Sequence, residues 1–220
     1  MSKQVLVVGL GQFGLGLVRA LSQSDVEIIA VDSDETQVNI ASSWVSRAVC
    51  FDATNEDALA QLHPEKRDVC VCATGDQSKE VGIICTALFK QLGAKRIIAR
   101  ANDDLHARIL RLVGADEVVN PEWDFGERFA PRIISENVLG EMLLGSDLVI
   151  SEVVAPEHIL GKSLADLKLQ TRFGITIIAV RDMKTGKINN VGPDYVVASG
   201  DVVISAARKG SIQRLLEEGT

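Results

Sequence analysis

Three glycines near the start of the chain have the spacing of a phosphate-binding loop. Gly9, Gly11 and Gly14 follow an unbroken apolar run and precede apolar residues at helical spacing. In such a strand-to-helix turn the first glycine permits a tight bend, the second lets a pyrophosphate approach the backbone, and the third lets the helix pack on the strand. Amides at the start of the helix then face the phosphates. The same spacing also fits a packing corner that binds no ligand.

An acidic residue stands where dinucleotide-binding units hold the ribose. A second apolar strand, residues 27–31, ends at Asp32, about 20 residues beyond the loop. The succession of strand, glycine turn, helix, strand and acid favours nucleotide binding over the packing corner. A carboxylate at this place accepts hydrogen bonds from ribose hydroxyls and repels a 2′-phosphate. We therefore expect NAD(H) or adenosine nucleotides to bind, and NADP(H) not to bind.

Composition excludes several classes of protein. The 220 residues carry a net charge of −7 and include six Phe, two Trp and one Tyr, which speaks against a nucleic-acid-binding groove. No apolar segment is long enough to span a membrane and no signal-peptide pattern is visible, so a cytosolic protein is expected. Cys50, Cys70, Cys72 and Cys85 lie in apolar stretches without metal-ligand spacing, which predicts buried thiols.

The first 120 residues alternate between apolar strands and amphipathic helices. Strands are expected at 4–9, 27–32, 47–51, 68–73, 95–100 and 116–119. One helical segment, residues 78–93, places Val81, Ile84, Cys85 and Leu88 on one face. This alternation predicts an α/β fold with a doubly wound, parallel, Rossmann-like sheet, in which ligands bind at the carboxyl ends of the strands. Polar residues follow those ends at 32–34, 52–54, 74–76, 100–102 and 120–122.

The pattern changes after residue 120. Residues 121–146 read as one linker helix that begins at Pro121 and is kinked by Pro131. Its apolar side chains, Phe125 and Phe129 among them, either cap the edge of the sheet or pack on a second copy of the chain. Residues 147–220 contain short strands, turn signals and short helices, which predicts a small α+β domain. At about 70 residues such a domain has a small core, and this favours a dimer.

Several stretches resemble the RCK (also called KTN) regulatory proteins of bacterial Ktr- and Trk-type potassium uptake systems. They read VVGLGQFG, AVDSDE, FDAT, CATGD, GADEVVNPE, GKSLADLKLQTRFGITIIAVRD and SGDVVISA, and they cover nearly the whole chain. The resemblance implies an RCK-N domain at 1–120, the linker helix at 121–146 and an RCK-C domain at 147–220. It implies a non-enzymatic cytoplasmic subunit that senses an adenine nucleotide. Homodimers would form an octameric ring beneath a membrane potassium channel or transporter, without entering the membrane. RCK-C would be a place for a small ligand such as a cyclic dinucleotide.

The resemblance also implies roles for individual residues. The phosphates would lie on the loop of Gly9, Leu10, Gly11, Gln12, Phe13 and Gly14. The ribose and adenine would be held by Asp32, Ser33, Asp52, Ala53 and Thr54, and a wall near the ribose and phosphates would come from Thr74 and Gly75. Arg100 would supply positive charge nearby. Glu122 matches a position that helps to hold a divalent cation at the dimer interface of ATP-bound relatives.

One residue departs from the pattern of the family. Gln12 stands where ATP-responsive Ktr proteins carry an arginine that reaches the terminal phosphate. A neutral amide lacks the charge-assisted hydrogen bonds that a γ-phosphate favours. A preference for ATP over ADP is therefore in doubt, and ADP, ATP, AMP and NAD(H) all stay open as ligands.

Other interpretations of these residues remain open from sequence alone. Asp52 fits a helix cap, Arg100 fits a surface ion pair with Asp103 or Asp104, and Glu122 at a helix start is stabilised by the helix dipole without any metal. The fold is also shared with NAD-dependent oxidoreductases, which are the alternative function. None of the histidines follows the carboxyl end of a predicted strand, and this favours the regulatory function. They are His63, His106 and His158.

Overall fold

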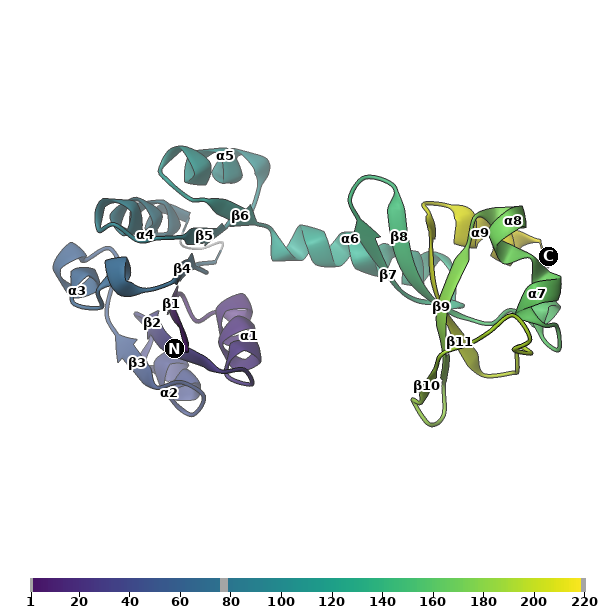
Figure 1. Cartoon of the computed structure of the whole chain (residues 1–220). Coiled ribbons are helices and arrows are strands. Elements are labelled where there is room, and N and C mark those ends of the chain that lie inside the picture. Colours follow the sequence, from purple (N-terminus) through teal and green to yellow (C-terminus); the bar gives the residue numbers. More distant parts are fainter. Residues whose placement is uncertain (1, 76–78, 219–220) are drawn as a thin grey trace. The chain divides into compact units, whose positions relative to one another are not determined.

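The computed structural model describes residues 2–75 and 79–218. The chain divides into two compact units, Met1–Glu122 and Trp123–Thr220 (Figure 1). Each unit has its own sheet and its own hydrophobic core. Within the described ranges, no helix combines the length and apolar character that crossing a membrane requires.

The first unit is built on a six-stranded parallel sheet. Its strands are β1 (Lys3–Val8), β2 (Val26–Asp32), β3 (Arg47–Cys50), β4 (Val69–Cys72), β5 (Ile97–Arg100) and β6 (Glu117–Val119). Their order across the sheet is β3-β2-β1-β4-β5-β6, and every neighbouring pair is parallel. This confirms the doubly wound sheet that the alternation predicts. The chain adds β2 and β3 on one side of β1, and β4, β5 and β6 on the other. Open α/β sheets form a ligand-binding crevice at such a switch point, here between β1 and β4.

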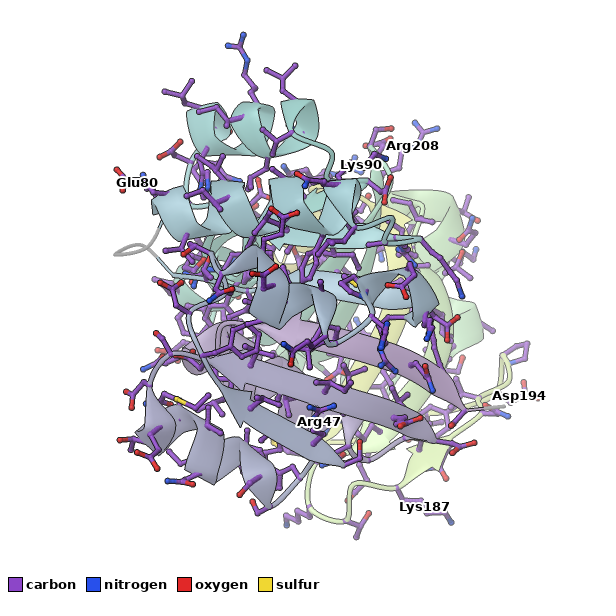
Figure 2. All side chains as sticks on the ribbon, turned by 90° about the vertical axis from the view of Figure 1, so that its left-hand side faces the viewer. Arg47, Glu80, Lys90, Lys187, Asp194 and Arg208 are labelled. Atoms are coloured by element: carbon purple, nitrogen blue, oxygen red, sulfur yellow. The ribbon has the colours of Figure 1, made fainter. Side chains whose placement is uncertain are left out.

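Helices cover both faces of this sheet because successive strand residues point to opposite sides. The helices are α1 (Gln12–Leu21), α2 (Glu35–Ser42), α3 (Glu56–Ala60), α4 (Lys79–Gln91) and α5 (Asp104–Leu112), with a 3₁₀ turn η1 (Pro64–Lys66). Val7 of β1 belongs to the same hydrophobic cluster as Val18 of α1, whereas its neighbour Val8 belongs to the cluster that contains Phe89 of α4. Charged side chains such as Arg47, Glu80 and Lys90 are exposed on the outside of the unit (Figure 2).

The buried face of α4 differs from the predicted one. Cys85 and Leu88 are buried as expected, but Ile84 is 44% exposed. The buried side of the helix also includes Gly82 and Phe89, so its centre is rotated away from Ile84. A small residue is needed at position 82, since a Cβ there would lie 2.7 Å from the Thr74 hydroxyl oxygen. The glycine thus allows this side of α4 to lie close to Thr74.

The second unit is a five-stranded antiparallel sheet with short helices. Its elements are β7 (Val138–Leu144), β8 (Leu148–Val154), η3 (Glu157–Ile159), α7 (Leu164–Leu167), α8 (Leu169–Phe173), β9 (Thr176–Asp182), β10 (Ile188–Asn189), β11 (Asp201–Arg208) and α9 (Ser211–Glu217). The strand order is β10-β9-β11-β8-β7. The core gathers Val153, Leu167, Val180, Val203 and Ile212 from five of these elements. The expected small α+β domain is therefore present.

The predicted linker helix is too long. Helix α6 spans Pro121–Ile134, and residues 138–144 form strand β7 rather than helix. Val138 pairs with Val153 and Leu144 with Leu148, so β7 and β8 form a hairpin. Residues 138 and 142 are four positions apart, a spacing that fits one face of a helix and also one face of a strand. Pairing with β8 selects the strand.

The prediction of four buried thiols is wrong for Cys50. Cys70, Cys72 and Cys85 are buried, but Cys50 is exposed. It is the last residue of β3, and β3 is the edge strand of the parallel sheet. An edge strand lacks a neighbour on one side, so an apolar stretch there does not bury every side chain.

Candidate functional site

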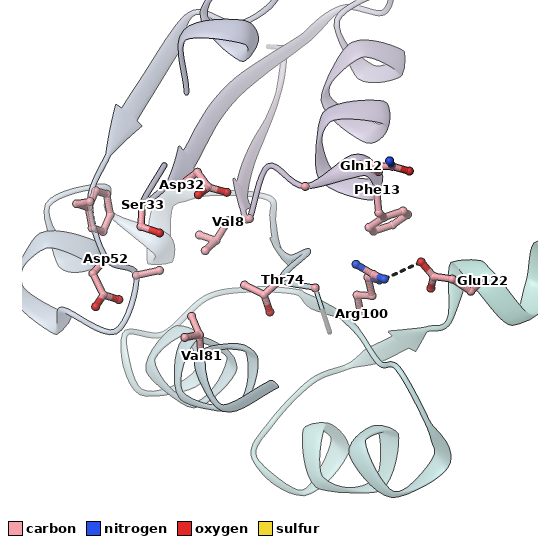
Figure 3. A pocket seen from close by; sticks show the side chains of 15 residues that line it. Val8, Gln12, Phe13, Asp32, Ser33, Asp52, Thr74, Val81, Arg100 and Glu122 are labelled. Atoms are coloured by element: carbon pink, nitrogen blue, oxygen red, sulfur yellow. Dashed lines mark hydrogen bonds and ion pairs between the residues drawn. The ribbon is translucent and has the colours of Figure 1, made fainter. Parts of the chain in front are cut away.

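A pocket of about 790 Å³ opens at the carboxyl edge of the parallel sheet, within the first unit (Figure 3). Most of the predicted site residues line it: Gly9, Gly11, Gln12, Phe13, Asp32, Ser33, Asp52, Ala53, Thr74, Gly75, Arg100 and Glu122. Leu10, Gly14 and Thr54 are not among the lining residues. Figure 3 shows Asp32, Ser33 and Asp52 on one side, and Gln12, Phe13, Arg100 and Glu122 on the other. One side of the pocket thus carries the carboxylates of Asp32 and Asp52, and the other combines the start of α1 with the pair of Arg100 and Glu122.

Two of the three loop glycines are required by packing. Gly9 has a φ of +92°, and a Cβ there would lie 2.8 Å from the Thr74 backbone nitrogen. A Cβ on Gly14 would lie 1.9 Å from the carbonyl oxygen of Gly9. The loop, α1 and the end of β4 therefore lie too close together for a side chain at Gly9 or Gly14, as expected of a packing corner.

Gly11 is different, because packing does not require it. A Cβ at this residue meets no described atom within 4 Å beyond its chain neighbours, and its φ of −66° suits any residue. Gly11 lines the pocket and directly precedes α1. A bare backbone at this place leaves room for a ligand at the positive end of the helix dipole. The packing-corner interpretation explains Gly9 and Gly14 but not Gly11.

Two backbone amides, one of them in the glycine loop, hold the carboxylate of Asp32 in place. One carboxylate oxygen accepts a hydrogen bond of 2.5 Å from the Leu10 amide, and the other accepts one of 2.9 Å from the Asp34 amide. Each oxygen keeps a further lone pair. Leu10 itself is fully buried, so its contribution is this backbone contact rather than a side chain in the pocket. The arrangement presents a carboxylate that can accept from two neighbouring hydroxyls.

Asp52 is not the cap of the helix that follows it. Asn55 caps α3 by accepting from the Ala58 amide at 3.1 Å. Asp52 accepts instead from the Thr54 amide at 2.9 Å and from the Thr54 hydroxyl at 2.8 Å. These two bonds hold the pKa of Asp52 below its usual value. Thr54 therefore positions the carboxylate of Asp52.

Arg100 forms an ion pair with another pocket residue, Glu122, rather than with Asp103 or Asp104. Its Nη2 donates to the Glu122 carboxylate at 2.6 Å, and its side chain is 10% exposed. Asp103, one of the partners considered from sequence, pairs with Lys79 at 2.6 Å and caps α5. The sequence pattern gives no sign of the pair between Arg100 and Glu122, which are 22 positions apart.

Three lining residues were missed by sequence reasoning: Val8, Phe51 and Val81. A signal existed for Phe51, which immediately precedes Asp52 and whose amide donates to the carbonyl of Asp32 at 3.0 Å. Val81 reads as a core residue of α4. Its place in the first turn, next to the end of β4, brings it to the pocket instead. Apolar side chains at these positions suit the flat faces of a base.

The described residues contain no group of three or more His, Cys, Asp or Glu side chains arranged for a metal ion. The cation role expected of Glu122 stays a prediction. No described residue lining the pocket is a histidine.

Two families match the two units. The TrkA-N domain family matches residues 5–121, and the TrkA-C domain family matches residues 148–218. The Ktr system potassium uptake protein C of Bacillus subtilis (strain 168) is 35% identical over 216 residues, which cover 97% of this chain and 96% of that protein. The Ktr system potassium uptake protein A of Vibrio alginolyticus is 35% identical over 179 residues, 81% of either chain.

Solved structures agree with this fold. The RCK domain of GsuK has a TM-score of 0.65 at 19% identity, and it covers 99% of this chain and 47% of that chain. A GsuK channel bound to NAD has a TM-score of 0.63 at 20% identity, covering 99% and 39%. At these identities the likeness concerns the fold alone. The two family matches and the Ktr proteins of 35% identity confirm the resemblance: the chain belongs to the RCK family of Ktr- and Trk-type potassium uptake regulatory proteins.

Proposed function

We propose that this chain is a cytoplasmic gating subunit that binds an adenine nucleotide and regulates a membrane potassium channel or transporter. The observation that carries the proposal is the pocket at the start of α1, where Gly11 leaves open space beside a fixed Asp32. It lies in a chain that is 35% identical to a Ktr potassium uptake protein along nearly its whole length. A GsuK channel of the same fold is bound to NAD.

Within this proposal the nucleotide lies across the pocket in one direction. The phosphates rest on the loop at Gly11 and the start of α1, close to Arg100. The ribose hydroxyls donate to Asp32, and the adenine reaches toward Phe51 and Asp52. Because Gln12 carries no charge that would bind a terminal phosphate, we expect no strong preference in affinity for ATP over ADP, AMP or NAD(H). A cyclic dinucleotide in the second unit stays a prediction.

Assembly is part of the same proposal. None of the residues of α6, all of them described, is buried, although the helix carries Phe125 and Phe129 with stacked rings. The first unit has an apolar groove of about 310 Å³ between α1 and the sheet. A second copy of the chain would cover such surfaces, and dimers would build an octameric ring. The nucleotide must bind two ring shapes with different affinity, since otherwise it shifts nothing.

The proposal is tested in cells. Deleting the gene in its own host should lower the rate of potassium uptake, and a plasmid copy of the wild type should restore it. A copy that folds but binds no nucleotide should fail to do so. Unchanged uptake after deletion would contradict the regulatory function. Steady NADH consumption by the purified protein with a small alcohol or hydroxy acid would favour an oxidoreductase instead.

Asp32 should select the ribose. Like charges brought together cost several kcal/mol, so we expect NAD to bind on the order of a hundredfold more tightly than NADP in calorimetry. Asp32→Asn keeps an acceptor for the Leu10 amide but removes the charge, and should reduce this ratio. Asp34→Asn is the matched control, because Asp34 caps α2 and does not line the pocket. Equal affinities of the wild type for NAD and NADP would remove Asp32 from the ribose role.

A further inference from the structure

Among the described residues, the ion pair with Glu122 uses only part of the hydrogen-bonding capacity of Arg100. A guanidinium has five N–H donors, and the carboxylate takes one of them from Nη2. The Nε atom is buried and has no hydrogen-bond partner among the described residues. Nη1 lies beside Gly75, where a Cβ would be 3.5 Å away. A cation whose side chain is 10% exposed and whose Nε has no described partner, at the wall of a pocket, is suited to an anion with several oxygens.

Glu122 has a different environment. Its side chain is 60% exposed, and it is the second residue of α6. It is also the last residue of the first unit, so α6 carries the chain from Glu122 directly into the second unit. Figure 3 shows the pair bridging the strand end that carries Arg100 and the first turn of α6. The ion pair is therefore a contact between the pocket and the start of the connecting helix.

We infer that this ion pair is a latch that nucleotide phosphate opens. A phosphate group at the start of α1 offers Arg100 two or three charged oxygens, whereas Glu122 offers one in the present geometry. The phosphate therefore takes the guanidinium, Glu122 loses its partner, and the first turn of α6 is released from the pocket wall. The inference rests on the proposed function, and it names the contact through which the pocket reaches the helix.

The latch depends on the charge of the ligand rather than on occupancy alone. Adenosine can fill the ribose and base side of the pocket, but it carries nothing that competes for Arg100. ADP carries the competing group. Comparing adenosine with ADP therefore separates binding in the pocket from release of the first turn of α6.

Trp123 follows Glu122 directly and reports on the first turn of α6. It is 67% exposed, and the chain has one other tryptophan, Trp44, so Trp44→Phe leaves a single reporter. In that background, with EDTA present to remove divalent cations, ADP should change the emission spectrum of Trp123. Adenosine should not, at concentrations where calorimetry shows the site filled.

The variant Glu122→Gln tests the latch directly. Because the side chain of Glu122 is 60% exposed, the substitution should not disturb folding. It keeps a hydrogen-bond acceptor but removes the negative charge that competes with phosphate for Arg100, so ADP should bind roughly fivefold more tightly, as expected for a partly exposed ion pair. The Trp123 spectrum without ligand should already resemble that of the ADP-bound parent. Glu127→Gln, an exposed acid on the same helix, is the matched control and should behave like the parent.

The outcomes separate the latch from the function on which it rests. If ADP binds Glu122→Gln and the parent with equal affinity, and Trp123 responds to ADP in both, the latch is wrong while nucleotide binding stands. An equal response of Trp123 to adenosine and ADP also overturns it. If calorimetry detects no binding of ADP or NADH to the wild type, the proposed function itself fails.

Discussion

Replacing Gly11 with valine should lower the affinity for ADP and NADH on the order of a hundredfold, or about 2.7 kcal/mol. The branched side chain would stand where the pyrophosphate approaches the backbone, at the start of α1. The fold should tolerate it, because a Cβ at Gly11 meets no described atom within 4 Å beyond its chain neighbours and the backbone is extended. Calorimetry measures the affinity, and thermal unfolding measures the stability.

Gly16→Val is the matched control for this variant. Gly16 lies in α1, a Cβ there meets no described atom within 4 Å beyond its chain neighbours and the backbone of the helix itself, and the residue does not line the pocket. It should bind nucleotide like the wild type. Wild-type affinity in Gly11→Val would show that the phosphates do not lie on this loop. The same variant supplies the nucleotide-blind copy that the uptake experiment requires.

Replacing both Phe125 and Phe129 with aspartate should dissociate the assembly. The rings stack at a centroid distance of 5.5 Å on a helix without buried residues, and Phe125 is 59% exposed. Two charges on that surface could not be buried against another copy without a large desolvation cost. Light scattering should give a mass near eight chains for the wild type and a much smaller mass for the variant.

Ile40→Asp controls for the added charge, since Ile40 is an exposed apolar residue of α2 outside the apolar groove. It should leave the mass unchanged. The Phe125/Phe129 variant should still bind ADP, because neither residue lines the pocket. A wild type that scatters as a single chain at micromolar concentration, with and without nucleotide, would contradict the ring.

The parallel sheet could be predicted because its central strands, β1, β2 and β4, are largely buried on both faces and so have continuous apolar sequences. The end of α6 could not. Val138 and Met142 fit a helix face and a strand face equally, and pairing of β7 with β8 selects the strand. The exposure of Cys50 is likewise set by the place of β3 at the sheet edge, which depends on the strand order.

The pocket residues contributed by the glycine loop and the strand ends could be predicted from their places at the ends of parallel strands. The partner of Arg100 could not, since proximity in sequence favours Asp103 and Asp104. Glu122 reaches Arg100 because β5 and β6 are adjacent and both end at the same edge. The different roles of the three glycines could not be predicted either. Their spacing in the sequence is the same for a glycine needed for packing and for one that leaves a pocket open, and only distances in the structure distinguish the two.

The exposed thiol of Cys50 makes the unmodified protein suitable for site-specific labelling. The other three cysteines are buried and out of reach of a maleimide dye, which should therefore attach to Cys50 alone. The sulfur of Cys50 lies 3.5 Å from the carbonyl oxygen of Ser33, which lines the pocket. Cys50 also directly precedes Phe51, another lining residue. A dye at this place would sit at the rim of the proposed adenine site, so its brightness could follow nucleotide exchange in real time without any engineered cysteine.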